Sequence, residues 1–177
     1  MLIAQITDTH IKSPGRLSYG KVDTCLYLWQ CVNHINALLP RPDVVLVTGD
    51  ITDFGRQEEY VQAGLLFEQL AMPYFLIPGN HDLSDEMRVE FNDHSYMPSH
   101  GFIQYVIEDF PIRMIGLDTT VSGQPYGLMC KERLNWLEKQ LMSQPNKPTL
   151  LFMHHPPFKT GIEHMDVQNC RNADALG

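Results

Sequence analysis

The stretch VVLVTGD, residues 44–50, decides the fold. Four apolar residues, Val44 to Val47, follow one another without the alternation expected of a half-exposed strand. Such a run is typical of a strand that is buried on both faces, as in a parallel sheet covered by helices. The run ends in Thr48-Gly49-Asp50, so a carboxylate stands at the carboxyl end of the strand.

The segments on both sides of this strand repeat an alternation of strand and helix. Further strands are expected at Leu2–Thr7 and Phe75–Ile77, and helices at Thr24–Leu39 and Glu58–Leu70. Pro40 and Pro42 stop the first of these helices. Because strands that alternate with helices form a parallel sheet with crossover connections, the pattern predicts the α/β class.

The second half of the chain departs from this alternation. Phe102–Phe110 and Ile112–Leu117 are expected to be two strands in succession, either a hairpin or part of a second sheet. A helix at Arg133–Met142 and a strand at Thr149–Met153 follow. Since no repeat or linker interrupts the sequence, one domain covering residues 1–177 is expected.

Composition and charge exclude several classes of partner. The formal net charge of −8 disfavours nucleic acid and anionic membranes, which need a basic surface. An anionic substrate held by a bound cation stays compatible with this charge. No secretory leader or membrane-length apolar run is apparent, and the cysteines form no C-x-x-C pair, so a cytoplasmic protein is expected.

Polar residues follow four of the expected strands. They are Asp8 and His10, then Asp50, then Asn80, His81 and Asp82, and finally His154 and His155. In open α/β sheets ligands bind beyond the carboxyl ends of strands, so these clusters are expected to meet at one edge. Each cluster alone is equally typical of a turn or of a hydrogen-bonded surface histidine. Together, carboxylates and imidazoles without Lys or Arg favour a divalent cation.

The spacing inside the clusters suits such a cation. Residues two apart on an extended strand point to the same side, so Asp8 and His10 are expected to bind one ion. Gly49 and Gly79 allow the backbone to approach the site closely. An Asp between two ions can bridge them, and two ions about 3.5–4 Å apart are the usual arrangement for displacement at phosphorus.

Four motifs together resemble the calcineurin-like metallophosphoesterase superfamily. They are ITDTH (6–10), VTGDITD (47–53), IPGNHD (77–82) and HHPPFKTGIEHMD (154–166). Within the superfamily they are most similar to cyclic-nucleotide phosphodiesterases and bacterial glycerophosphodiesterases. The resemblance implies a metallophosphoesterase-like α/β/β/α sandwich with mixed sheets. It also implies hydrolysis of a phosphodiester by a bridging hydroxide in a dinuclear centre of iron, manganese, zinc or cobalt.

The resemblance also implies a role for each matching residue. The expected metal ligands are Asp8 and His10 for the first ion, Asp50 as the bridge, and Asn80 and His154 for the second ion. His81 is expected to stabilise or protonate the phosphoryl group and the leaving oxygen, and Asp82 to orient His81. His155 either supports the site or exchanges roles with His154.

The sequence departs from the family pattern after His155. The family pattern ends with a later Gly-His-x-His element that supplies one His to each ion, and residues 156–177 contain no such element. The chain therefore resembles the first two thirds of such an enzyme, with one ligand missing at each ion. His100 and His164 are weak candidates to replace it. Without its last strands the sheet would have an open edge, which leaves a homo-oligomer as an option.

Three functions remain in competition at this point. The first is hydrolysis of a small-molecule phosphodiester, with neither nucleic acid nor membrane as a partner. The alternative is a truncated, non-catalytic metal-binding or assembly module of the same fold. A nucleotide-binding doubly wound domain ranks last, because no G-x-G-x-x-G or phosphate-binding loop follows any expected strand.

Overall fold

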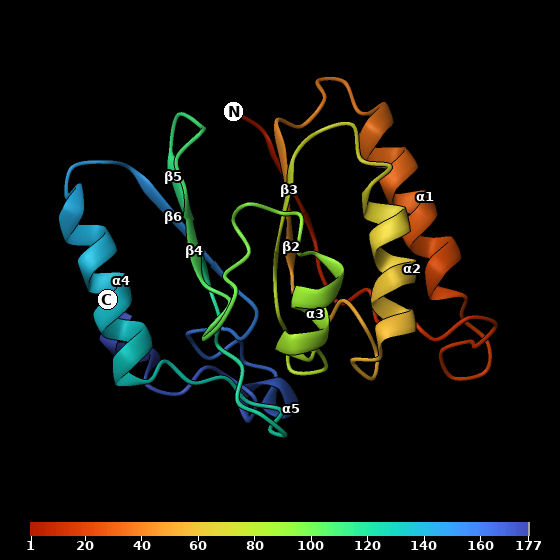
Figure 1. Ribbon diagram of the computed structural model, residues 1–177. Helices are drawn as coiled ribbons and strands as arrows, with labels where there is room; N and C mark the ends of the chain where they lie inside the picture. The colour runs from red at the N-terminus through yellow and green to blue at the C-terminus, as the bar shows by residue number, and fades with distance from the viewer. Residues whose placement is uncertain (177) are drawn as a thin grey trace.

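The computed structural model describes residues 1–176 and has the four-layer arrangement shown in Figure 1. The strands are β1 (Ile3–Ile6), β2 (Val44–Thr48), β3 (Tyr74–Ile77), β4 (Tyr105–Ile107), β5 (Arg113–Leu117) and β6 (Thr149–Met153). The helices are α1 (Thr24–Ala37), α2 (Gln57–Phe67), α3 (Ser84–Glu90), α4 (Lys131–Ser143) and α5 (Glu163–Asp166), followed by a 3-10 helix at Ala173–Leu176. Helices α1 and α2 flank the β1–β3 sheet, and α4 flanks the β4–β6 sheet on the opposite side (Figure 1). The expected α/β sandwich is therefore confirmed.

The first sheet is the parallel one that the sequence predicts. Its strand order is β1-β2-β3, and both pairings are parallel. All five residues of the central strand β2 are buried, as its unbroken apolar run requires. The parallel pairing places the carboxyl ends of these strands at the same edge.

The second sheet is mixed. Strands β4 and β5 pair antiparallel, so the expected hairpin is present, and β6 joins β5 in parallel. The strand that precedes His154 thus belongs to this sheet and not to the first one. The polar clusters therefore lie at the ends of strands in two neighbouring sheets, not along one edge of a single sheet. The simple alternation of elements does not predict this division.

Aromatic side chains join the two sheets. The hydroxyl of Tyr105 on β4 donates a hydrogen bond of 2.6 Å to the carbonyl of Leu76 on β3. The rings of Tyr96 and Phe75 lie 4.9 Å apart, and that of Tyr96 lies 4.6 Å from the ring of Tyr105. Buried aromatic rings of this kind contribute a large apolar area and fix the relative position of the layers.

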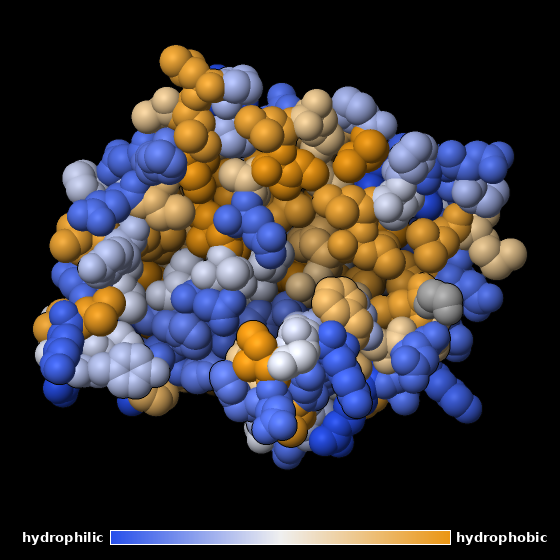
Figure 2. All heavy atoms as spheres, turned by 180° about the vertical axis from the view of Figure 1, so that it is seen from behind, coloured by the Kyte–Doolittle hydropathy of each residue, from blue (hydrophilic) through white to orange (hydrophobic). Residues whose placement is uncertain are grey.

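On the rear side of the molecule an apolar groove runs between the two sheets. It measures about 570 Å³ and is lined largely by residues of β1, β2 and β6, among them Ile3, Leu46 and Leu151. Figure 2 shows hydrophobic residues gathered across the middle of this face. No helix within residues 1–176 combines the length and the apolar character needed to cross a membrane.

Candidate metal centre

Asp50 stands at the centre of the polar cluster, directly after β2. Its side chain is almost fully buried, and its two carboxylate oxygens face two different histidines. Oδ2 lies 3.7 Å from Nε2 of His10, and Oδ1 lies 3.6 Å from Nε2 of His154. His10 follows β1 of the first sheet and His154 follows β6 of the second, so Asp50 connects the two sheets at this point.

These separations suit ligands of shared ions better than hydrogen bonds. A hydrogen bond between such atoms measures about 2.7–3.2 Å, whereas two ligands about 2.1 Å from one ion are typically separated by more than 3 Å. Nε2 of His10 also lies 3.8 Å from Oδ1 of Asp8, which completes a group of three donors around one point. Nδ1 of His10 is buried and has no hydrogen-bond partner within the described chain. The donor set therefore fits a divalent cation.

Asp8 and His10 reach this position by a different backbone path from the expected one. Both residues have left-handed torsions, with φ of 55° for Asp8 and 41° for His10, so they do not continue the extended strand β1. Their amides instead donate to the carbonyls of Gly49 and Asp50, at 3.1 and 3.0 Å. The two side chains converge because the loops after β1 and β2 are hydrogen-bonded to each other. Strained torsions of this kind often cluster at functional sites.

Gly79 allows the loop after β3 to pass directly over Asp50. A Cβ atom at Gly79 would lie 2.2 Å from Oδ1 of Asp50 and 2.3 Å from its amide nitrogen. Gly49 is equally crowded, since a Cβ there would lie 2.6 Å from Nδ1 of His154, and its φ is 93°. The expected close approach of the backbone at both glycines is thus present in the structure.

The electrostatics of the cluster favour a positive charge. The carboxylate of Asp8, above all, raises the pKa of His10; burial opposes this effect, and Asp50 and Asp53 reinforce it. Burial would raise the pKa of Asp8, but interactions with His10 and Thr7 outweigh burial and lower it. The carboxylates that favour a proton on His10 would equally favour a metal cation beside it.

Asp53 belongs to the cluster although no role is expected for it from the sequence. Its Oδ1 lies 3.6 Å from Nδ1 of His10, and Lys12 contacts its other oxygen. Its backbone carbonyl accepts a hydrogen bond of 2.8 Å from Nδ1 of His81. A basic side chain is therefore present at the margin of the cluster, contrary to the expectation, and it pairs with Asp53. The second Asp in VTGDITD is the only signal in the sequence for this contact.

The structure distinguishes the two adjacent histidines. Nδ1 of His154 donates to the carbonyl of Thr48 at 2.8 Å, and its Nε2 is directed to Asp50. A backbone carbonyl that orients a ligating imidazole in this way is a common feature of metal sites. Nδ1 of His155 is instead paired with the Thr119 hydroxyl at 2.8 Å. Burial lowers the pKa of His155 to about 4, so it is neutral at physiological pH.

His81 is exposed beside the centre. Because a carbonyl can only accept, the bond to Asp53 places a hydrogen on Nδ1 of His81 and leaves Nε2 free to exchange a proton. The amide of His81 donates to Oδ1 of Asp50 at 2.9 Å, and its ring meets that of His10 edge-on at 4.8 Å. This position is compatible with the expected contact to a substrate.

The expected direct contact between Asp82 and His81 is not present among the described residues. The buried carboxylate of Asp82 accepts hydrogen bonds from the amides of Gly79, Ile51 and Thr52, at 2.9 to 3.1 Å. The hydroxyl of Tyr60 also donates to it, at 3.1 Å. Among the described residues it makes no hydrogen bond with His81. Asp82 binds the loops after β2 and β3 together because its oxygens point into the backbone of both.

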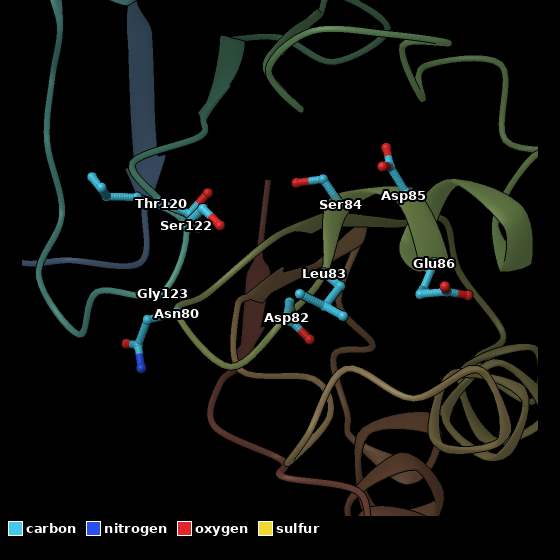
Figure 3. A pocket seen from close by; sticks show the side chains of 10 residues that line it. Asn80, Asp82, Leu83, Ser84, Asp85, Glu86, Thr120, Ser122 and Gly123 are labelled. Carbon is cyan, nitrogen blue, oxygen red and sulfur yellow. The ribbon is translucent and has the colours of Figure 1, made fainter.

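Asn80 lines a cavity of about 360 Å³ that opens beside the centre (Figure 3). One wall comes from the first turn of α3 with Ser84, and the other from the loop after β5 with Thr120 and Ser122. The Asn80 side chain makes no hydrogen bond within residues 1–176, so its amide is available to a ligand. His100 and His164 are exposed and belong to neither group of potential metal ligands in the described chain.

The fold and this cluster define a class of protein: a mixed α/β sandwich with carboxylate and imidazole side chains gathered at its strand ends. A family model described as calcineurin-like phosphoesterase matches residues 1–175, and the chain belongs to this family. The resemblance expected from the four motifs is thereby confirmed. Divalent metal ions follow from membership of this metallophosphoesterase family.

Curated relatives match over nearly the whole chain. The probable glycerophosphodiester phosphodiesterase of Arcobacter nitrofigilis is 50% identical over 182 residues, which cover 100% of this chain and 67% of the relative. The glycerophosphodiester phosphodiesterase of Enterobacter lignolyticus is 37% identical over 99% of this chain and 64% of its own length. The probable cyclic nucleotide phosphodiesterase of Rhodopseudomonas palustris is 35% identical, with the same coverage. The chain thus spans about two thirds of the length of these relatives.

Proposed function

We propose that the chain carries the centre of a metal-dependent phosphodiesterase in which Asp50 bridges two cations. The observation that carries this proposal is the position of Asp50, whose two oxygens face Nε2 of His10 and Nε2 of His154 from opposite sides. Asp8 would complete the first ion's ligands and Asn80 the second's. When bound, the cations would neutralise the phosphodiester charge and activate water at neutral pH.

The chain's own residues would position the substrate and move its protons. His81 is exposed, and its Nδ1 is fixed by the carbonyl of Asp53, so its Nε2 is free to approach a substrate oxygen. In the protonated form it would donate a hydrogen bond to the charge that develops on the leaving oxygen. Asp82 holds the loop that carries both Asn80 and His81, so the geometry of both depends on it.

We further infer that glycerophosphodiesters are better substrates than cyclic nucleotides. The relatives named glycerophosphodiester phosphodiesterases are 50% and 37% identical, and the one named a probable cyclic nucleotide phosphodiesterase is 35% identical. The cavity beside Asn80 presents the hydroxyls of Ser84, Thr120 and Ser122. Such hydroxyls can exchange hydrogen bonds with a polyol. Comparing turnover of glycerophosphoethanolamine with that of cyclic AMP tests this choice.

The activity itself is tested with bis(p-nitrophenyl) phosphate and added Mn²⁺. The proposal predicts turnover that is lost on chelation with EDTA and restored by Mn²⁺. The competing proposal is a module of the same fold that binds metal without catalysis. Metal binding without turnover would favour that module over the phosphodiesterase.

His81→Ala gives a sharper test of the catalytic assignment. The proposal assigns His81 to the leaving oxygen of the substrate, so Mn²⁺ affinity should persist in this variant while kcat falls about 10²-fold or more. His100→Ala serves as a control, since His100 is also exposed and, within residues 1–176, is hydrogen-bonded only to Ser99. An unchanged kcat in His81→Ala would show that the role given to His81 is incorrect.

A further inference from the structure

A buried arginine outside the candidate metal centre contacts the loop that forms one wall of the cavity beside Asn80. Arg133 lies on α4, and only 4% of its surface is exposed. Its guanidinium donates to the carbonyl of Leu128 and, at 2.6 Å, to the carbonyl of Thr120. It also lies 3.7 Å from Oδ1 of Asp118, and it stacks at 3.9 Å over the ring of Phe102. These polar contacts all go to the loop between β5 and α4.

This loop provides the cavity wall opposite α3. Thr120, Val121, Ser122 and Gly123 line the cavity on one side, and Ser84, Asp85 and Glu86 line it on the other. Figure 3 shows the two walls facing each other, with Asn80 next to the loop. The position of residues 120–123 therefore sets the width of the space beside the metal centre.

Asp118 connects Arg133 to Thr120 in the loop. Its Oδ1 accepts hydrogen bonds from the amide and the hydroxyl of Thr120, at 2.9 and 2.7 Å. Its Oδ2 accepts from the amide of Ile103 at 3.0 Å. A buried carboxylate needs a positively charged or hydrogen-bond-donating partner. The guanidinium of Arg133 and the carboxylate of Asp118 therefore stabilise each other.

The residue between Asp118 and Thr120 connects the loop to the metal centre. Thr119 is fully buried, and its hydroxyl pairs with Nδ1 of His155 at 2.8 Å. The His155 ring meets the ring of His154 edge-on at 4.8 Å. The loop is therefore fixed to α4 at Thr120 and to the strand end of β6 at Thr119.

We propose that Arg133 is a positioning residue that fixes the 120–123 wall and so selects the alcohol group of the phosphodiester that fits beside the centre. This inference rests on the proposed phosphodiesterase function. Within the described chain Arg133 forms no hydrogen bond or ion pair with Asp50 or the histidines, so it acts through the loop. A planar guanidinium serves two carbonyls and a carboxylate at once, whereas the ammonium of Lys cannot reproduce that geometry.

Arg113 offers a matched control. It is also a buried arginine, with 2% of its surface exposed, and it too donates to backbone carbonyls, those of Gln140 and Gln144. Its remaining partner is the hydroxyl of Thr149. None of these groups lines the cavity, so removing Arg113 disturbs α4 and β6 without releasing the wall.

The experiment compares Arg133→Met and Arg133→Lys with Arg113→Met and Arg113→Lys, in the Mn²⁺-loaded protein. Hydrogen exchange of the amides of residues 119–123 should accelerate in the Arg133 variants and stay unchanged in the Arg113 variants. With bis(p-nitrophenyl) phosphate, KM should rise about tenfold in Arg133→Met while kcat changes less than about threefold. With the smaller methyl p-nitrophenyl phosphate, KM should change little. Where the Met variants fail to fold, the Lys variants carry the comparison.

The possible outcomes separate this inference from the proposed function. A wild-type chain that binds Mn²⁺ but hydrolyses neither ester would refute the proposed phosphodiesterase activity. Hydrogen exchange of residues 119–123 would still test whether Arg133 fixes the loop. Suppose that the amides of residues 119–123 exchange equally fast, and that KM changes by the same factor, in the Arg133 and Arg113 variants. Such a result would overturn the role of Arg133. Equal losses of kcat with both esters would likewise overturn it, since they indicate general damage instead of selection.

Discussion

At the scale of single residues, the contact between Gly79 and Asp50 leaves no room for a side chain. Gly79→Ala would place a Cβ atom 2.2 Å from Oδ1 of Asp50, so the carboxylate or the loop must move. We expect the free energy of unfolding to fall by about 1–3 kcal/mol. We also expect Mn²⁺ affinity to fall at least tenfold, by isothermal titration calorimetry, because Asp50 would no longer face both histidines.

Gly64→Ala is the control for this substitution. Gly64 is also buried, but it lies within α2, and its Cβ would meet first the terminal oxygen of Glu90, the end of a flexible side chain. Alanine is favoured over glycine inside a helix by about 1 kcal/mol, so stability should not drop much. Wild-type Mn²⁺ affinity in Gly79→Ala would contradict the central position of Asp50.

The roles of individual residues were predictable only where the side chain itself acts. Asp8, His10, Asp50 and His154 stand out as metal-binding types after strands, and the structure brings them together. The contact of Asp53 with His81 could not be predicted, because it is made by the backbone carbonyl, which no residue type reveals. The expected pairing of Asp82 with His81 fails for a similar reason: the donors that Asp82 meets are backbone amides.

At the scale of elements, the hydroxyl of Tyr60 links α2 to the loop that follows β3. Tyr60 on α2 is fully buried; its hydroxyl accepts from the amide of Leu83 at 2.8 Å and donates to Asp82. Tyr60→Phe would leave the Leu83 amide without this partner and Asp82 with one donor fewer. We expect a loss of about 1–3 kcal/mol in the free energy of unfolding, measured with guanidinium chloride.

Tyr27→Phe provides the comparison for Tyr60→Phe. Tyr27 lies on α1 with its side chain exposed, and its hydroxyl makes no hydrogen bond within the described chain. Removal of this hydroxyl should change stability by less than about 0.5 kcal/mol. Equal effects of the two substitutions would show that the hydroxyl of Tyr60 does not hold the loop.

His94, in the segment after α3, is expected to make the stability of the fold depend on pH. Burial lowers the pKa of His94, an effect only partly offset by Asp93 and Glu68. Its Nε2 pairs with the hydroxyl of Tyr74 at 3.2 Å. The unfolded chain therefore binds a proton at His94 more readily than the folded chain does. The contribution of neutral His94 to the free energy of unfolding is present above about pH 6.5 and is lost as the pH falls below it.

His94→Phe tests this dependence because it keeps an aromatic ring and removes the titrating group. The neighbouring rings of Tyr74 and Tyr96 have their centroids 5.0 and 5.3 Å from the His94 ring. Urea unfolding at about pH 7.5 and pH 5.5 should show a smaller loss of stability in the variant than in the wild type. If stability falls as much in His94→Phe as in the wild type, the pH dependence comes from other groups.

Most elements could be predicted from periodicity, but the short helices α3 and α5 could not. The strands β1, β2, β3 and β6 and the helices α1, α2 and α4 lie close to their expected positions. Helix α3 was not expected, because its seven residues follow the polar motif at once and are too short for a clear apolar period. Its first turn forms a wall of the cavity, so part of the candidate site was also missed.

At the scale of the whole molecule, the metal centre depends on how the two sheets meet. The strand-end pattern predicted that the four polar clusters share one edge of a parallel sheet, whereas β6 and its His154 belong to a second sheet. The four-layer sandwich followed from the resemblance of the motifs and not from hydropathy. Contacts such as that of Tyr105 with Leu76 bring the sheets together, and they depend on tertiary packing that local patterns do not encode.

The central claim is that Asp50 bridges two cations, one on the His10 side and one on the His154 side. The most direct measurement is an anomalous difference map from crystals soaked with Mn²⁺. We expect two peaks about 3.5–4 Å apart, each in contact with one oxygen of Asp50. One of them should be close to Asp8 and His10, and the other close to Asn80 and His154. A single peak, or peaks that do not touch Asp50, would contradict this claim.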